Sequence, residues 1–214
     1  MAVRPIFVVT ESSPFVKTIP TSFSWHSGLS ISQKRKNIHA LHYAFLLEHP
    51  EYSEVLEIST KSLSNLGNSL SAFNLTKYVV SEKMHRPVEC LYQGSKVFPN
   101  GGPCVDLYNT TPKEAKKDPR LAIHPVCEYC FEGNRYPATP KTAFYDWLYI
   151  NALFEHDDLA KQLVSYSAFT DIEFNPQKGS NCQAHAAAMF VSLYKKELLH
   201  RCHDFQDYLK VVTE

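Results

Sequence analysis

The sequence of 214 residues lacks several features that mark particular protein classes. Lys plus Arg and Asp plus Glu number 22 each, so there is no global basic field of the kind that binds nucleic acid unspecifically. No run approaches the roughly 18 apolar residues of a membrane span, and the N-terminus has no charged-then-apolar signal pattern. No Gly/Ser/Pro-rich linker divides the chain. We therefore expect a cytoplasmic protein without membrane contact, folded as a single domain over residues 1–214.

Cysteine is also sparse, and its six positions do not resemble the dense framework of a small secreted domain. We expect reduced thiols. Cys127 and Cys130 form one C-x-x-C motif after His124, and Cys104 is a further potential zinc ligand. A single C-x-x-C without a second pair at standard spacing is a weak zinc signal. We expect neither a metal nor a cofactor.

The stretch 88–98 is central to our interpretation. If it is helical, Glu89, Tyr92, Gln93 and Lys96 lie on one side at i, i+3, i+4 and i+7, and apolar residues take the other side. A carboxylate and an ammonium roughly 10 Å apart along the axis leave room for a sugar ring. A surface helix with a solvated polar face is the alternative interpretation.

Hydrophobic periodicity predicts a mixture of helices and short strands. Thr111, Pro112 and Glu114 give a capping-box helix start, and Gly94 in mid-helix indicates close packing of another element. The segment 141–154 is apolar nearly all round and should cross the core. We expect an α+β fold, helix-rich with a small β-sheet. The predicted helices are 32–49, 88–98, 112–117, 141–154, 157–165 and 181–200, the predicted strands are 6–10, 55–60 and 170–174, and a hairpin-like excursion covers 77–86.

Two local groups of cations stand out against the zero net charge. The first opens a predicted helix, where positive charge opposes the helix dipole, so something other than helix stability favours it. A phosphate backbone or a diphosphate is the functional interpretation, and a solvated surface cluster is the alternative. The first cluster is Lys34, Arg35 and Lys36, and the second is Lys113, Lys116 and Lys117, with Arg120 just beyond.

Two acids alternate with apolar residues near the end of the chain. On a strand over 170–174, Asp171 and Glu173 would share one face roughly 7 Å apart. Such a pair is a candidate acid/base couple. Two solvated acids on an edge strand are the alternative.

The order of these motifs resembles the NADAR family, whose pattern combines a Leu-Ser-Asn-Phe-like segment, a Glu-His-x-x-Gln helix, a Pro-x-x-Ala-Lys stretch and a Glu-x-Ser-Pro segment. Segments 33–41, 56–62 and 140–153 more specifically resemble the NADAR branch associated with DarT-type DNA-guanine ADP-ribosyltransferase toxins. Cys90 replaces a frequent His, Ala72 replaces Asn, and 181–183 differ from the family's Asp-x-x-Trp-Gly ending. The matching stretches are Leu70-Ser71-Ala72-Phe73-Asn74, Glu89-Cys90-Leu91-Tyr92-Gln93 with Lys96, Pro112 with Ala115-Lys116, and Ile172-Glu173-Phe174-Asn175-Pro176.

The resemblance implies an ADP-ribosylglycohydrolase that removes ADP-ribose from guanine in DNA and releases ADP-ribose as product. It would act in the cytoplasm as a bacterial antitoxin of a DarT-like toxin or as a phage-encoded countermeasure. We expect single-stranded DNA to be preferred, because a duplex must first expose the guanine edge. Two alternatives stay open: a non-catalytic module that binds ADP-ribose or ADP-ribosylated nucleic acid, and an N-glycosidase acting on phosphorylated riboflavin precursors.

This chemistry assigns a role to each candidate residue. Cleavage passes through an oxocarbenium-like state and needs a carboxylate near C1″, a proton route to the base and a positioned water. Glu89 is the first-choice carboxylate, and Glu173 with Asp171 supplies the second. Lys96 would hold the ribose hydroxyls or the diphosphate, or attack an opened sugar. The remaining expectations are Ser71, Asn74, Gln93 and Lys61 as substrate ligands, Tyr92 or Trp147 as a stacking ring, and Lys34, Arg35, Lys36, Lys116 and Lys117 as nucleic-acid contacts.

Overall fold

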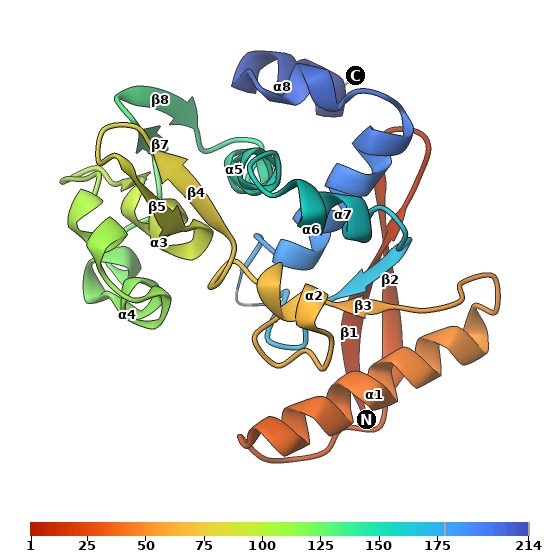
Figure 1. Ribbon diagram of the computed structural model, residues 1–214. Helices are drawn as coiled ribbons and strands as arrows, with labels where there is room; N and C mark the ends of the chain where they lie inside the picture. The colour runs from red at the N-terminus through yellow and green to blue at the C-terminus, as the bar shows by residue number, and fades with distance from the viewer. Residues whose placement is uncertain (178, 214) are drawn as a thin grey trace.

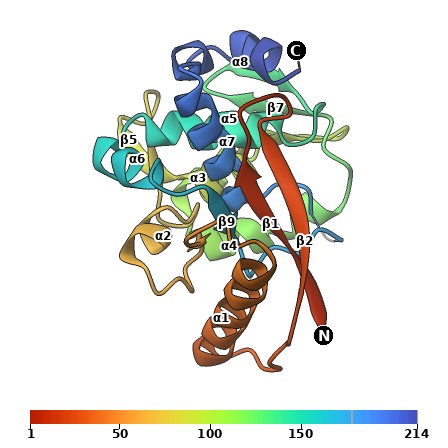
Figure 2. The same ribbon diagram turned by 90° about the vertical axis from the view of Figure 1, so that its right-hand side faces the viewer.

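A four-stranded sheet in the order β2-β1-β9-β3 separates two hydrophobic clusters, with α1 on one face and α7 on the other (Figures 1 and 2). β1 is antiparallel to β2 and β9, and β3 is parallel to β9.

The structure, a computed structural model, describes residues 1–177 and 179–213. The strands are β1 (Ala2–Val9), β2 (Val16–Phe23), β3 (Leu56–Glu57), β4 (Thr76–Val79), β5 (Met84–Pro87), β6 (Lys96–Val97), β7 (Glu128–Phe131), β8 (Asn134–Pro137) and β9 (Ala168–Thr170). The helices are α1 (Ile31–Glu48), α2 (Asn65–Ser69), α3 (Val88–Gly94), α4 (Pro112–Lys117), α5 (Ala143–Leu153), α6 (Asp157–Leu163), α7 (Gln183–Lys195) and α8 (Phe205–Thr213), with 3-10 turns η1 (Val105–Asn109), η2 (Pro119–Ala122) and η3 (Leu199–Cys202).

Alternation along β1 divides its side chains between the two faces of the sheet. Ile6 and Val8 are buried against the α1 side, where Leu41 and Phe45 repeat at helical spacing. Phe7 belongs to the larger cluster on the opposite face. The predicted helix and strand are therefore confirmed, although α1 is capped by Ser30 and not by Ser32.

Helix α5 crosses the larger core, as predicted, and all of its residues are buried. Its polar groups have partners, as burial requires. The Asn151 amide donates to the carbonyls of Trp147 and Cys202, each at 2.9 Å, and Asp146 Oδ2 lies 3.2 Å from His185 Nδ1. The helix begins at Ala143, later than the predicted start at residue 141.

Helix α3 is shorter than the predicted 88–98 segment and ends at Gly94. Lys96 and Val97 leave the helix to pair with Tyr129 and Glu128 of β7. The close packing predicted at Gly94 is confirmed, because a Cβ there would lie 2.5 Å from the Tyr108 ring. Strand pairing with a distant segment thus overrides the continuous helical pattern.

Several other boundaries differ from the sequence-based expectation because tertiary pairing decides them. β2 is not among the predicted strands, although it pairs with β1 along its whole length. β9 ends at Thr170, so Asp171 and Glu173 do not share a strand face. The predicted strand 55–60 is shortened to the two residues of β3, and α2 follows it where no helix was predicted. The predicted helix 181–200 is α7 followed by η3, with α8 beyond it. The hairpin at 77–86 and the capping box of α4 are confirmed.

Candidate active site

A polar cavity of about 760 Å³ opens between α3, α4 and the segments that follow β3 and β9. In Figure 1, α3 and α4 lie together on one side of the sheet, away from α1. The cavity volume is in the range of small-molecule sites. Of the residues predicted for the site, those at its wall are Glu89, Lys96, Asp171, Glu173, Ser71, Tyr92, Gln93, Lys61, Lys116 and Lys117.

A hydrogen-bonded chain joins Lys96, Gln93 and Glu89 at this wall. The Lys96 ammonium donates to Gln93 Oε1 at 2.6 Å, and Gln93 Nε2 donates to Glu89 Oε1 at 2.9 Å. Glu89 and Gln93 are buried, with 6% and 7% of their surface exposed. The Lys96 ammonium also lies 4.7 Å from the centroid of the Tyr92 ring. The Gln93 amide therefore fixes the orientation of both charged groups.

The pKa of Lys96 is lowered to about 8 because the group is buried, with the Glu89 charge opposing the shift and the Lys116 charge adding to it. Lys96 therefore remains mostly charged at pH 7 and loses its proton under mildly alkaline conditions. An ammonium in this state can hold anionic or hydroxyl oxygens of a ligand.

A second acid at the cavity wall, Asp171, is half-buried and lies directly after β9. Asp171 accepts a hydrogen bond from Gln183 Nε2 at 3.0 Å and one from the backbone of Glu173 at 2.9 Å. Burial raises the pKa of Asp171 to about 8, and the neighbouring Glu57 carboxylate raises it as well. Asp171 is therefore a neutral acid at pH 7, with a proton to donate.

Glu57 supports this arrangement from beneath the cavity. Its carboxylate, 3% exposed, accepts hydrogen bonds from Ser59 Oγ at 2.6 Å, Thr170 Oγ1 at 2.7 Å and the Ile172 backbone at 2.9 Å. Burial also raises the pKa of Glu57. Glu57 thus anchors the segment that carries Asp171 to the segment after β3.

Aromatic rings and an amide complete the floor. The Tyr92 hydroxyl lies 3.3 Å from that of Tyr129 and accepts a hydrogen bond from Asn181, while the Tyr145 ring meets Tyr92 edge-on at 5.0 Å. Asn181 Oδ1 is buried and has no hydrogen-bond partner within residues 1–177 and 179–213. This oxygen is available to a donor on a bound ligand.

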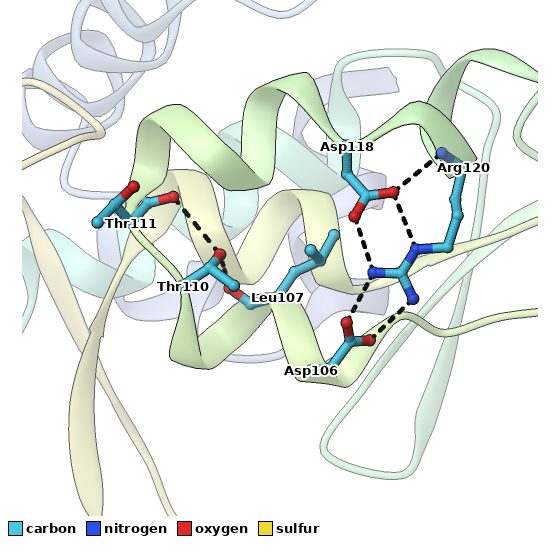
Figure 3. A network of polar contacts seen from close by, with 6 residues as sticks. All are labelled: Asp106, Leu107, Thr110, Thr111, Asp118 and Arg120. Atoms are coloured by element: carbon cyan, nitrogen blue, oxygen red, sulfur yellow. Dashed lines mark hydrogen bonds and ion pairs between the residues drawn. The ribbon is translucent and has the colours of Figure 1, made fainter.

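The second cation cluster lines the cavity from α4, since Lys113, Lys116 and Lys117 all belong to its wall. The Lys116 ammonium lies 5.7 Å from the Phe73 ring centroid. Arg120 is occupied elsewhere: it donates to Asp106 Oδ2 at 2.6 Å and to Asp118 Oδ1 at 2.9 Å (Figure 3). Both carboxylates hold the turn after α4 in place, so the lysines are the cations that face a ligand.

The first cation cluster lies at the lip of the cavity. The Lys34 ammonium is 3.1 Å from Glu173, and Arg35 Nε donates to the Lys61 carbonyl at 3.4 Å. None of the three residues of this cluster belongs to the cavity wall, and Lys36 is exposed. Glu173 is paired with Lys34 and its side chain is 40% exposed, whereas Asp171 is half-buried.

Two predicted ligands lie away from the cavity. Asn74 is exposed and donates to the Asn68 carbonyl at 2.9 Å. Trp147 packs in an aromatic core cluster with Tyr136 and Phe205, so it does not offer a face to a ligand in the cavity. Their neighbours in sequence are near the site, but helix and turn geometry directs these two side chains elsewhere.

Sequence interpretation missed four residues that build the site: Glu57, Tyr145, Asn181 and Gln183. The one available signal was Glu57, an acid between the apolar Leu56 and Ile58 of a predicted strand. Such an acid points to the face opposite its apolar neighbours, and it is buried only if both faces of the strand are covered. The others depend on contacts between residues far apart in sequence.

The C-x-x-C motif does not form a metal cluster in the described part of the chain. Cys127 is exposed and precedes β7, while Cys130 lies on it. Within residues 1–177 and 179–213, no three His, Cys, Asp or Glu side chains gather in a metal-binding arrangement. Over the same residues, no helix is both long and apolar enough to span a membrane.

The fold is α+β, and acids and lysines line one cavity. The family model described as DarT1-associated NADAR antitoxin matches residues 2–214, and the chain therefore belongs to that family. No curated protein matches the chain. Membership supports a role as an antitoxin paired with a DarT toxin.

Proposed function

We propose that the protein is an ADP-ribosylglycohydrolase that cleaves the bond between ribose C1″ and a guanine nitrogen in DNA. The reaction would reverse the modification made by the toxin with which the family is associated. The observation that carries this proposal is the pair of acids at one cavity, the buried Glu89 and the half-buried Asp171, of which Asp171 is a neutral acid at pH 7. Environments that give two carboxyl groups different protonation states favour acid/base division of labour.

Glu89 and Asp171 divide the chemistry between them. As the C1″–N bond breaks, its electron pair leaves with guanine and Asp171 donates a proton to the departing nitrogen. Glu89 stabilises the oxocarbenium-like state and takes a proton from the water whose oxygen bonds to C1″. Return of that proton to Asp171 restores the resting enzyme. The net reaction consumes one water and yields ADP-ribose and unmodified guanine.

The cations around the acids suit the other parts of the substrate. Lys96, fixed by Gln93, lies beside Glu89 and can hold ribose hydroxyls. Lys113, Lys116 and Lys117 face the same cavity and suit a diphosphate, since ammonium groups bind phosphate as point charges. Lys34 and Arg35 lie at the lip, where the DNA backbone would pass.

The test is incubation of the purified protein with guanine-ADP-ribosylated single-stranded DNA and, separately, with phosphorylated riboflavin precursors. The proposal requires free ADP-ribose and restored guanine from the modified DNA, with no sugar release from the precursors. Retention of the modified DNA without release would identify a binding module instead. Cleavage of the precursors alone would identify a small-molecule N-glycosidase.

A further inference from the structure

A second aromatic feature lies outside the cavity, on the exposed segment between β2 and α1. The partly exposed Trp25 belongs to this segment. Asn37 of α1, completely buried, accepts a hydrogen bond from the backbone N–H of His26 at 2.7 Å and donates to the His26 carbonyl at 2.9 Å. An interior amide therefore fixes the backbone beside the partly exposed Trp25.

Two cations lie at the Trp25 ring. The Arg4 guanidinium carbon is 5.4 Å from the ring centroid and the Lys34 ammonium is 5.9 Å from it. Arg4 Nε is buried and has no acceptor in the described part of the chain. These groups suit a single nucleotide. Its base can stack on the aromatic ring, and its phosphate can accept from the unpaired donor and the ammonium.

This feature is continuous with the cavity. The same Lys34 ammonium that lies at the Trp25 ring is 3.1 Å from Glu173, which belongs to the cavity wall. Arg35 reaches the Lys61 carbonyl on the same lip. In Figure 2, α1 lies at the end of the sheet where β1, the strand that carries Arg4, begins. A DNA strand that leaves the cavity at this lip would reach Trp25 next.

We propose that Trp25, with Arg4 and Lys34, is a stacking site for an unpaired base of the DNA strand next to the modified guanine. A base on the ring displaces one cation toward the phosphate of the same nucleotide, so a cation–π contact is exchanged for stacking and a phosphate contact. Packing of Trp25 on Phe23, at 6.0 Å between centroids, holds the ring in place. The identity of the strand rests on the proposed function, whereas the base site itself does not.

The binding test uses tryptophan fluorescence and does not depend on catalysis. The chain has two tryptophans, and Trp147 is 7% exposed in the core, so quenching by an external base reports on Trp25. An unmodified single-stranded oligodeoxythymidine should quench the tryptophan fluorescence of the wild-type protein and of Trp147→Phe. It should leave the fluorescence of Trp25→Phe unchanged. Trp25→Ala should bind the oligonucleotide roughly tenfold or more weakly, the cost of one lost stacking contact. Circular dichroism of each variant verifies that it is folded.

Equal quenching in wild type and Trp25→Phe would overturn the proposal. Equal quenching by a duplex of matched length would also overturn it, because paired bases cannot stack on the ring. With modified substrates, Trp25→Ala should raise KM for the oligonucleotide and leave cleavage of ADP-ribosyl-guanosine unchanged. If the wild-type protein cleaves neither substrate, the proposed hydrolase function fails, while the quenching result still decides the base site.

Discussion

Gln183 donates a hydrogen bond from Nε2 to Asp171 Oδ2 at 3.0 Å, while its Oε1 accepts from the backbone N–H of Ala72 at 2.7 Å. Nε2 also donates to the Ile58 carbonyl at 2.7 Å. One side chain at the start of α7 thus joins three chain segments that meet at the cavity. Asp171 is positioned by this contact as well as by its own turn.

Replacing Gln183 by Ala should therefore destabilise the protein and impair activity together. The substitution leaves the buried Ala72 N–H and the Ile58 carbonyl unpaired, which costs about 1–3 kcal/mol. Chemical denaturation measures the loss. Gln162→Ala is the matched control, because that amide donates to Asp158 on the surface and its removal should cost little. Equal stability of the two variants would show that Gln183 does not hold the segments together.

The pH dependence of cleavage should have an alkaline limit near pH 8. Asp171, with its pKa raised to about 8 by burial and by Glu57, donates its proton only below that pH. Activity should therefore fall as pH rises through about 8. Lys96, with a pKa lowered to about 8 by burial, loses its charge in the same range and steepens the fall. A rate that keeps rising above pH 9 would exclude Asp171 as the acid.

Glu57→Gln separates these two titrations. The amide keeps the size of Glu57, and its oxygen can still accept from Ser59 and Ile172. Its NH₂ can donate to the Thr170 hydroxyl. That hydroxyl can then donate to His42 Nε2, which lies 2.7 Å away. Burial lowers the pKa of His42 to about 4, so this ring is neutral and can accept. Without the neighbouring negative charge, the pKa of Asp171 falls, and the alkaline limit should move to lower pH. An unmoved limit would assign it to Lys96.

The two cation clusters should respond differently to charge reversal. Arg35→Glu with Lys36→Glu should weaken turnover of modified oligonucleotides and flatten its salt dependence, because phosphate contacts release counterions. It should spare ADP-ribosyl-guanosine. Lys116→Glu with Lys117→Glu should impair both substrates, since both residues line the cavity. Lys34 is left intact because it pairs with Glu173.

Lys17→Glu with Lys195→Glu is the control for that experiment, since it makes the same change in net charge at exposed positions of β2 and α7. Its kinetics on both substrates should match the wild type. If this control loses as much activity as Arg35→Glu with Lys36→Glu, the effect comes from overall charge and not from those two positions.

Metal removal should leave activity unchanged. The proposed chemistry uses two carboxyl groups and water, and we expect no stoichiometric zinc in the purified protein. Elemental analysis before and after EDTA treatment, with activity measured on the same samples, tests this. Zinc near one atom per chain that disappears in Cys127→Ser would make the C-x-x-C motif a structural site.

Much of the fold was predictable because local patterns agree with it. The apolar stripe of α1, the capping box of α4 and the all-apolar α5 follow from spacing alone. The end of α3 was not predictable, because Lys96 and Val97 pair with β7, about 30 residues away along the chain. Nor was β2, whose pairing with β1 outweighs its one proline, Pro20.

For the site, residue types were easier to predict than contacts. The sequence places Glu89, Gln93 and Lys96 together on the assumption that all three lie on one helix face. In the structure Lys96 lies beyond the end of the helix and still donates to Gln93. Asp171 was selected as half of a strand-face pair, but its partner in the structure is Glu57, 114 positions earlier. Trp147 was misplaced because an aromatic helix gives no indication of which ring reaches a cavity. Burial and long-range pairing are properties of the folded chain.

The most direct test of the account is multiple turnover of guanine-ADP-ribosylated single-stranded DNA by wild type, Glu89→Gln and Lys96→Ala. Glu89→Gln keeps size and hydrogen bonding but loses the charge that stabilises the oxocarbenium-like state, and Lys96→Ala removes the ammonium held by Gln93. With substrate in excess, the wild-type protein should release many equivalents of ADP-ribose, and both folded variants should lose at least about 10²-fold in rate. Release by Glu89→Gln at near wild-type rate, or no release by the wild-type protein, would contradict the account.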